Sequence, residues 1–216
     1  MAASIHTVET ALQKTAREIQ RYGLNDMLVF NSAYQIITAQ IQVGLQNNLF
    51  RKPKLVELLD IEFANFYFRA LDEYYMHKKL PGAWQKLLKC SNKPAFIKLL
   101  IGANAHINHD LPMALAKLSL NQQTAIKNDF FATDTIFRQS SKEIIHSFEE
   151  PNQLFRFIKN HFRLLYEKPI IAIIIHWRHR AWKNSQALRH GRINQEDLVK
   201  HSNQIANSLI DLSIFN

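Results

Sequence analysis

The stretch LVELLDIEFANFYFRALDEYYMHKK, residues 55–79, decides the fold class. Apolar residues recur along it at helical spacing and share one face with an acid: Leu55, Leu58, Leu59, Glu62 and Phe66. Pro53 precedes the stretch by two positions, where a first-turn proline begins a helix. We therefore predict one long helix, with Glu62 as a candidate buried acid and with Asp60 and Asp72 in solvent.

The same helical periodicity extends over the rest of the chain. Gly23 ends a first helix that begins near Thr7, and Asn194 begins the last helix, with Asp197 at the third position of a capping box. Between these ends, helices are expected over residues 26–46, from Pro81, from Pro94, and over 121–138, 140–149, 152–166 and 169–190. No stretch alternates for long with the period of two that marks a strand. The sequence thus predicts an all-α fold.

Length and composition indicate how these helices are organised. A chain of 216 residues with 47% hydrophobic residues and 14 Phe can bury a substantial core, and 5 Gly with 6 Pro leave few tight turns. We predict a single-domain bundle, residues 1–216, of about 8–10 helices. Residues 25–190 would form its core, the N- and C-terminal helices would pack on it, and Pro112 would kink a central helix.

Three features bear on the compartment. The lone cysteine, Cys90, excludes an internal disulfide framework and a zinc site with several Cys ligands. The N-terminal residues MAASIHTVET contain no basic segment followed by an apolar core, so we expect no signal peptide. The most apolar run, residues 169–177, is far shorter than the roughly 20 residues that span a bilayer. The sequence therefore predicts a cytoplasmic protein without a membrane span.

The net charge of +9 bears on the partners of the protein. The basic residues are scattered and form no dense tail, RGG repeat or zinc-finger spacing, so specific nucleic-acid binding is not expected. The charge can attract an anionic small molecule, whereas the aromatic-rich residues 63–75 are compatible with an apolar ligand. The expected partner is a small molecule of either kind.

The stretch IGANAHINHDLPMAL, residues 101–115, is the strongest candidate for a functional site. On a helix, His106 and Asp110 lie one turn apart on a face that begins apolar, so both side chains are expected to point towards the core. Pro112 disfavours helical geometry at the residue before it. This predicts a break or kink just after Asp110 and open space beside the two side chains.

The neighbouring polar residues of this stretch are expected to have other roles. Asn104 and Asn108 share an adjacent face, where buried amides either hold neighbouring helices or line a polar pocket. His109 points in another direction, and we expect it to be exposed.

A His-x-x-x-Asp pair on a helix has three interpretations. Imidazole and carboxylate one turn apart form a two-ligand metal clip. The same pair forms a hydrogen-bonded dyad, in which the Asp fixes the tautomer of the His for acid–base catalysis. Alternatively, the pair is structural and joins a kinked helix to its neighbours.

A second polar cluster follows the apolar run near residue 175. His176 and His179 are three residues apart and can reach one metal. Arg178 and Trp182 are four apart, so the guanidinium can lie on the indole or reach a carboxylate. Asp129 is a further candidate acid.

Several motifs together resemble a family of all-helical bacterial proteins with a central NAHIN-x-DLP signature. That signature occupies residues 104–112 here, and the other matching pieces are FNSAYQIIT with Phe30, Tyr34 and Thr38, FANFYFRAL from Phe63, Trp84, NDFFATD around Asp129, and Arg178 with Ala181 and Trp182. The resemblance covers roughly residues 25–190. It implies a fold and a shared site, and it implies no activity.

The segment AHINHDLP is also similar to the AH-x-x-x-D-L segment of the zinc-dependent phospholipase C and single-strand nuclease superfamily. The resemblance implies that His106 and Asp110 bind zinc. The chain lacks an obvious third His-x-x-x-acid pair, so the implied site has one or two metals rather than three.

These patterns leave three hypotheses open. The first is a metal-dependent hydrolase of the phosphoester type, with a divalent ion of Zn, Fe or Mn at His106 and Asp110. Its ligand sphere would be completed from the side chains of His176, His179, Glu62 and Asp129. Arg178 would stabilise the developing negative charge.

The second hypothesis is a metal-free enzyme for a small molecule. Asp110 and His106 would form its general base, and the substrate would be oriented by Asn104, Asn108, Tyr34 and Trp182. The third is a non-catalytic ligand-binding or scaffold protein, in which the polar cluster holds the core together.

Overall fold

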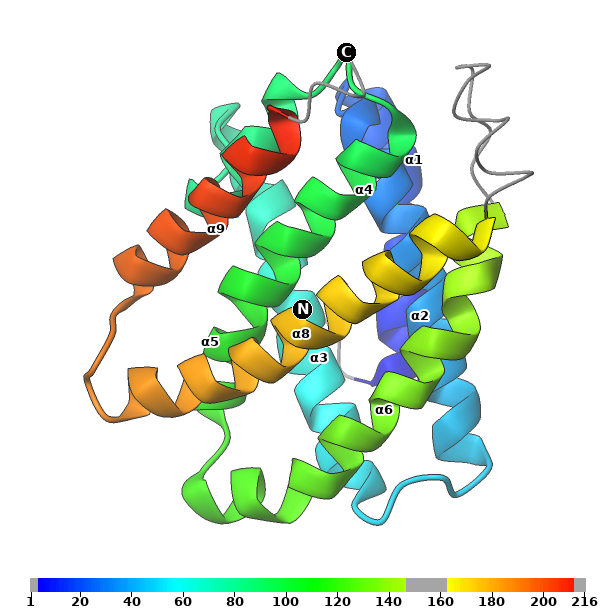
Figure 1. Ribbon diagram of the computed structural model, residues 1–216, viewed down its shortest axis with the longest axis vertical. Helices are drawn as coiled ribbons and strands as arrows, with labels where there is room; N and C mark the ends of the chain where they lie inside the picture. The colour runs from blue at the N-terminus through cyan, green and yellow to red at the C-terminus, as the bar shows by residue number, and fades with distance from the viewer. Residues whose placement is uncertain (1–3, 147–162, 212–216) are drawn as a thin grey trace.

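The computed structural model describes residues 4–146 and 163–211, and over these residues the chain contains eight α-helices and no strand (Figure 1). The α-helices are α1 (Ile5–Arg21), α2 (Leu28–Gln46), α3 (Pro53–His77), α4 (Ala95–Asn104), α5 (Leu111–Lys117), α6 (Leu120–His146), α8 (Arg163–Arg189) and α9 (Gln195–Ile210). Two 3-10 helices, η1 (Asn25–Met27) and η2 (Gly82–Lys89), and one π-helical turn, η3 (Ala105–Asp110), connect them. The predicted all-α fold is confirmed.

Local signals in the sequence set several helix ends. Asn194 accepts a hydrogen bond from the backbone of Asp197, whose side chain accepts one in return, so the predicted capping box begins α9. Pro53 stands in the first turn of α3, as predicted.

The two helices expected over 121–138 and 140–149 form the continuous helix α6 up to His146. Most of the helix expected over 152–166 lies outside the described residues.

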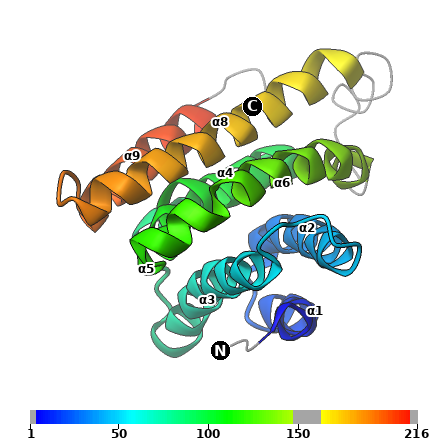
Figure 2. The same ribbon diagram turned by 90° about the horizontal axis from the view of Figure 1, so that it is seen from below.

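The helices stack in layers (Figure 2). The outer layer of α8 and α9 packs on α4, α5 and α6, which in turn pack on α2 and α3, and α1 covers the far side. The π-helical turn η3 contacts α3, α8, α9 and η2, so it lies in the middle of the stack. None of the described helices is both long and apolar enough to cross a membrane.

The central helix continues where the sequence predicted a break. Leu111 keeps helical geometry, with φ −63° and ψ −43°, although Pro112 follows it, and α4, η3 and α5 run on without interruption. A proline ring in a regular helix collides with the carbonyl four residues earlier. A π-helical turn is wider than an α-helical one and accommodates the ring. Of the predicted break or kink after Asp110, the break was therefore wrong, and the helix instead widens into the turn that carries the site residues.

Candidate functional site

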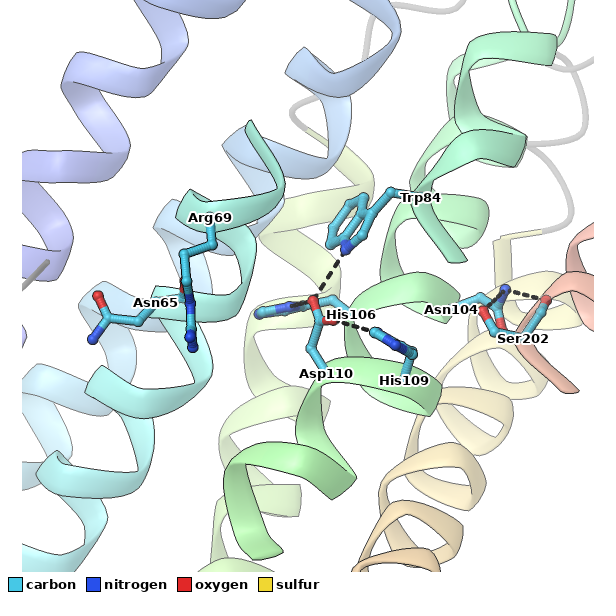
Figure 3. A network of polar contacts seen from close by, with 8 residues as sticks. All are labelled: Asn65, Arg69, Trp84, Asn104, His106, His109, Asp110 and Ser202. Atoms are coloured by element: carbon cyan, nitrogen blue, oxygen red, sulfur yellow. Dashed lines mark hydrogen bonds and ion pairs between the residues drawn. The ribbon is translucent and has the colours of Figure 1, made fainter. Parts of the chain in front are cut away.

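The carboxylate of Asp110 lies at the centre of a buried polar network (Figure 3). Nδ1 of His106 lies 2.9 Å from one carboxylate oxygen, Oδ2, and Nδ1 of His109 lies 2.6 Å from the other, Oδ1. The indole Nε1 of Trp84, on η2, donates a hydrogen bond to Oδ2 at 3.1 Å. All four side chains are buried. Three N–H groups therefore surround one carboxylate that has lost its contact with water.

The charges in this network follow from burial and hydrogen bonding. Burial alone would raise the pKa of Asp110, but the hydrogen bonds from His106 and His109 outweigh it and hold this pKa below its usual value. Burial lowers the pKa of His106, and the hydrogen bond and charge of Asp110 offset only part of this effect. At neutral pH the pair is thus a carboxylate beside a neutral imidazole.

These charges assign the tautomer of His106. An ionised carboxylate only accepts hydrogen bonds, so Nδ1 carries the ring proton, and Nε2 of the neutral ring is left with a lone pair. Nε2 of His106 is buried and has no hydrogen-bond partner within the described part of the chain. It is therefore an unsatisfied base on a ring whose orientation Asp110 fixes.

Aromatic rings enclose this imidazole. Phe63, on α3, stacks on His106 with ring centroids 3.6 Å apart and planes at 8°, and Tyr34, on α2, approaches it edgewise at 4.7 Å. Phe30 packs on it from α2 with centroids 5.5 Å apart. Gly102 permits this packing, because a Cβ built at that position would lie 2.7 Å from Cβ of Phe30. Apolar packing thus keeps water from the imidazole.

An apolar cavity of about 140 Å³ adjoins this ring. Its walls come from α2, α3, α4, η3, α5, α6 and α8, and they are formed mainly by Phe, Ile, Leu, Val and Ala side chains. The polar side chains in the walls are Tyr34, Asp60, His106, Thr133, Ser141 and Arg178. The cavity is comparable in size to an engineered cavity of roughly 150 Å³ that binds benzene.

Asp60 and Tyr34 carry further unsatisfied atoms in the cavity wall. Oδ2 of Asp60 and the hydroxyl of Tyr34 are buried and have no hydrogen-bond partner among the described residues. Burial, with a contribution from the charge of Glu57, raises the pKa of Asp60 to about 7. The expectation that Asp60 lies in solvent was wrong, because the buried face of α3 runs through Val56, Asp60 and Ala64 rather than through Glu62.

The two Asn residues of the central stretch hold helices together. The side-chain amide of Asn104 donates to the backbone carbonyl of Ser202, on α9, at 2.8 Å, and to its hydroxyl at 3.1 Å. Asn108 donates to Oδ1 of Asn104 at 3.0 Å. Neither Asn lines the cavity, so these amides attach α9 to the central helix. His109 is 6% exposed, and the expectation that it faces solvent was wrong, because η3 is enclosed on several sides.

Two acids predicted as metal ligands have other partners. Glu62 is partly exposed and forms an ion pair with Lys117, on α5, at 2.5 Å, so it is not the buried acid that the sequence suggested. Both carboxylate oxygens of Asp129 accept backbone N–H groups, from Arg51 at 3.0 Å and Lys52 at 2.6 Å, just before α3. Asp129 thus satisfies backbone donors at the start of that helix.

The predicted site residues on α8 contact side chains of α6 instead of a metal site. Asp134, on α6, accepts a hydrogen bond from Nε of Arg178 at 3.0 Å, and its other carboxylate oxygen lies 2.6 Å from Nε2 of His179. The side chain of His176 is exposed. The guanidinium of Arg178 lies over the rings of Phe130 and Phe137 rather than over an indole. Trp182 packs on Phe130 and Phe131 and does not line the cavity.

The candidate metal ligands therefore do not converge. In residues 4–146 and 163–211, no three or more His, Cys, Asp or Glu side chains are grouped so that they hold a metal ion. His106 and Asp110 remain together, as the sequence predicted, with His109 and Trp84 as partners that it did not predict.

Fold and site together define a class: an all-α protein with a buried His–Asp network beside an apolar cavity. The model of a family of unknown function, DUF5995, matches residues 5–212, and the chain belongs to this family. No curated protein and no solved structure matches the chain significantly.

Proposed function

We propose that the protein binds a small, mainly apolar molecule in this cavity and transfers a proton with His106 as general base. The observation that carries the proposal is the buried lone pair at Nε2 of His106, on a ring whose Nδ1 is fixed by Asp110. A base–orienter pair of this kind is the arrangement used for general acid–base catalysis.

The surroundings of His106 suit this role. Burial lowers the pKa of His106, so the imidazole stays in its basic form at neutral pH. When the ring accepts a proton, the resulting imidazolium lies beside the carboxylate of Asp110, 2.9 Å from Nδ1, which stabilises the new charge. The apolar walls exclude water, which strengthens this electrostatic interaction.

Metal-dependent phosphoester hydrolysis has weaker support. The similarity to the zinc-dependent phospholipase C superfamily concerns only His106 and Asp110, and the other predicted ligands contact different partners. Both oxygens of Asp110 already accept N–H groups, and Oδ2 accepts two, so a metal would compete with Trp84, His106 and His109 for the carboxylate lone pairs. The apolar walls also offer little to the charged oxygens of a phosphoester.

A base in an apolar cavity can be tested with a nitrobenzisoxazole, a flat aromatic probe of suitable size. A base removes the proton from its ring carbon, the N–O bond breaks, and the electrons form a nitrile and a coloured phenolate. Wild-type protein should accelerate this reaction, and His106→Gln should lower the rate about a hundredfold or more. His77→Gln, at an exposed position on α3, is the control and should leave the rate unchanged.

Three results would reject the proposal. One is an equal rate for wild type and a folded His106→Gln. Another is loss of the wild-type rate on adding a chelator, which would favour the metal-dependent hydrolase. The third is no rate in the wild type together with a lower melting temperature of His106→Gln, which would assign the network to the stability of the core.

A further inference from the structure

We propose that Tyr34 and Asp60 bind the oxygen of a carbonyl group, so the substrate is a neutral carbonyl compound with an apolar body. The inference rests on the proposed function, because the base for this substrate is His106. It assigns a role to Asp60, and it narrows the reaction to proton transfer at a carbon next to the carbonyl.

The three side chains lie on one cavity although they come from three segments. Tyr34 is on α2, Asp60 on α3 and His106 on η3, and all three line the same apolar walls. The ring of Tyr34 contacts the imidazole of His106, with centroids 4.7 Å apart. Tyr34 is also close enough to Asp60 for the charge of that carboxylate to raise the pKa of Tyr34, after the larger effect of burial.

Each of the three side chains presents a buried polar atom without a partner among the described residues. An unsatisfied buried polar atom costs about 1–3 kcal/mol, so three on one cavity indicate that a ligand completes their hydrogen bonds. Two types of group are present. His106 offers a lone pair, whereas the hydroxyl of Tyr34 and a protonated Asp60 offer hydrogen atoms.

The groups around Asp60 favour its protonated form. Glu57 on the same helix is acidic, Tyr34 on α2 stays neutral because its pKa is raised, and His106 on η3 is neutral with Asp110 beyond it. Among the described residues, the cationic side chain in the cavity wall is Arg178, which is already paired with Asp134 at 3.0 Å. A negatively charged ligand would therefore lie near acidic side chains and would find no unpaired cation in the described cavity wall. The favoured ligand oxygen is thus that of a neutral group.

The reaction step balances as a proton shift. Nε2 of His106 takes a proton from the carbon next to the carbonyl, and the C–H electrons form a carbon–carbon double bond. The carbonyl oxygen gains negative charge and accepts hydrogen bonds from Tyr34 and Asp60, which act as an oxyanion hole. The imidazolium then returns a proton to carbon, which regenerates the ketone without a further reactant. Where the proton on Nε2 has first exchanged with solvent, the carbon receives a solvent proton.

The test compares acetophenone with ethylbenzene, a pair of similar shape that differ in the carbonyl oxygen. In deuterated buffer, wild-type protein should exchange the methyl hydrogens of acetophenone for deuterium, as followed by NMR. Tyr34→Phe and Asp60→Leu should each lower the exchange rate about a hundredfold. By calorimetry, the dissociation constant of acetophenone should rise about tenfold in each variant, whereas that of ethylbenzene should stay the same.

Asp60→Asn serves as the conservative variant. Its amide keeps a hydrogen-bond donor and loses the titrating group, so it should retain more exchange than Asp60→Leu and lose the decline in rate above about pH 7. A purely structural role of Asp60 would instead change the binding of ethylbenzene and acetophenone equally. That result would overturn the inference.

The outcomes separate this inference from the proposed function. If acetophenone is not exchanged while the nitrobenzisoxazole is still opened in a His106-dependent reaction, the carbonyl assignment is wrong and the base assignment stands. If neither reaction occurs, both are wrong. Exchange that depends on His106, Tyr34 and Asp60 together supports both.

Discussion

Phe63 lies flat against the imidazole of His106, with ring centroids 3.6 Å apart and planes inclined by only 8°. The contact joins α3 to η3 and closes one side of the ring to water. Because burial is the largest cause of the lowered pKa of His106, this stacking helps to keep the imidazole neutral.

Replacing Phe63 by Leu should therefore raise the pKa of His106 towards 6.5, because a smaller side chain admits water beside the ring. NMR titration of the imidazole measures this shift. Phe66→Leu is the control, since Phe66 lies on the same helix under Arg69 and Lys117 instead. An unchanged pKa of His106 in Phe63→Leu would mean that other side chains exclude water from the imidazole.

Trp84→Phe keeps an aromatic ring and removes the N–H that binds Asp110. We expect the free energy of unfolding to fall by about 1.5–3 kcal/mol, the usual contribution of a hydrogen bond to a charged group. Urea denaturation measures this change. Trp182→Phe is the control, because it removes a similar ring volume from a buried indole that does not contact Asp110. An equal fall in the free energy of unfolding in both variants would contradict a special role of the Trp84 hydrogen bond.

Gly102→Ala should disturb the packing of α4 on α2. The added methyl group would lie 2.7 Å from Cβ of Phe30, which is fixed to the backbone and has little freedom to move. Overpacking of this kind costs about 1–3 kcal/mol, and Phe30 would shift on the ring of His106. Gly44→Ala is the matched control, because its methyl group meets the outer ring atoms of Phe50 at 3.1 Å. Similar melting temperatures for the two variants would contradict the tight fit at Gly102.

The raised pKa of Asp60 predicts how stability changes with pH. The unfolded chain loses the Asp60 proton near its ordinary pKa of 3.8, whereas the folded protein keeps it until about pH 7. Between these values the unfolded state binds fewer protons, so the free energy of unfolding falls as pH rises, by up to about 4 kcal/mol. Asp60→Asn should remove this contribution.

The stability difference between Asp60→Asn and wild type should therefore shift in favour of the variant from pH 4 to pH 7 and level off above. The comparison between the two proteins cancels the opposite effect of His106, whose lowered pKa reduces stability as pH falls below 6.5. Denaturant titrations at several pH values measure the difference. A difference that stays constant over this window would show that Asp60 titrates normally.

Helical spacing and end signals were sufficient to predict the fold class. Asn194 and Pro53 act where their local chemistry places them, because a cap or a first-turn proline depends on a few neighbouring residues. The four-residue spacing of His106 and Asp110 likewise predicted their contact, since such a pair meets within one helical segment. The π-helical turn preserved this contact while it removed the predicted break.

The rest of the site depends on contacts between distant segments. Trp84 reaches Asp110 across 26 positions, and no local pattern in the sequence specifies that pairing. Asp60 and Glu62 are two positions apart on α3, and only the packing of α3 against its neighbours decides which of the two is buried. The cavity likewise combines residues from seven segments, so sequence periodicity could suggest aromatic walls but not their arrangement.

The most direct test of the account is long-range nitrogen NMR of the His106 ring in the wild-type protein, with and without ethylbenzene. We predict a protonated Nδ1 and an unprotonated Nε2 at neutral pH, and a shift of the ring signals when ethylbenzene enters the cavity. A proton on Nε2, or ring signals that do not respond to saturating ethylbenzene, would contradict the assignment of His106 as the base of an apolar binding site.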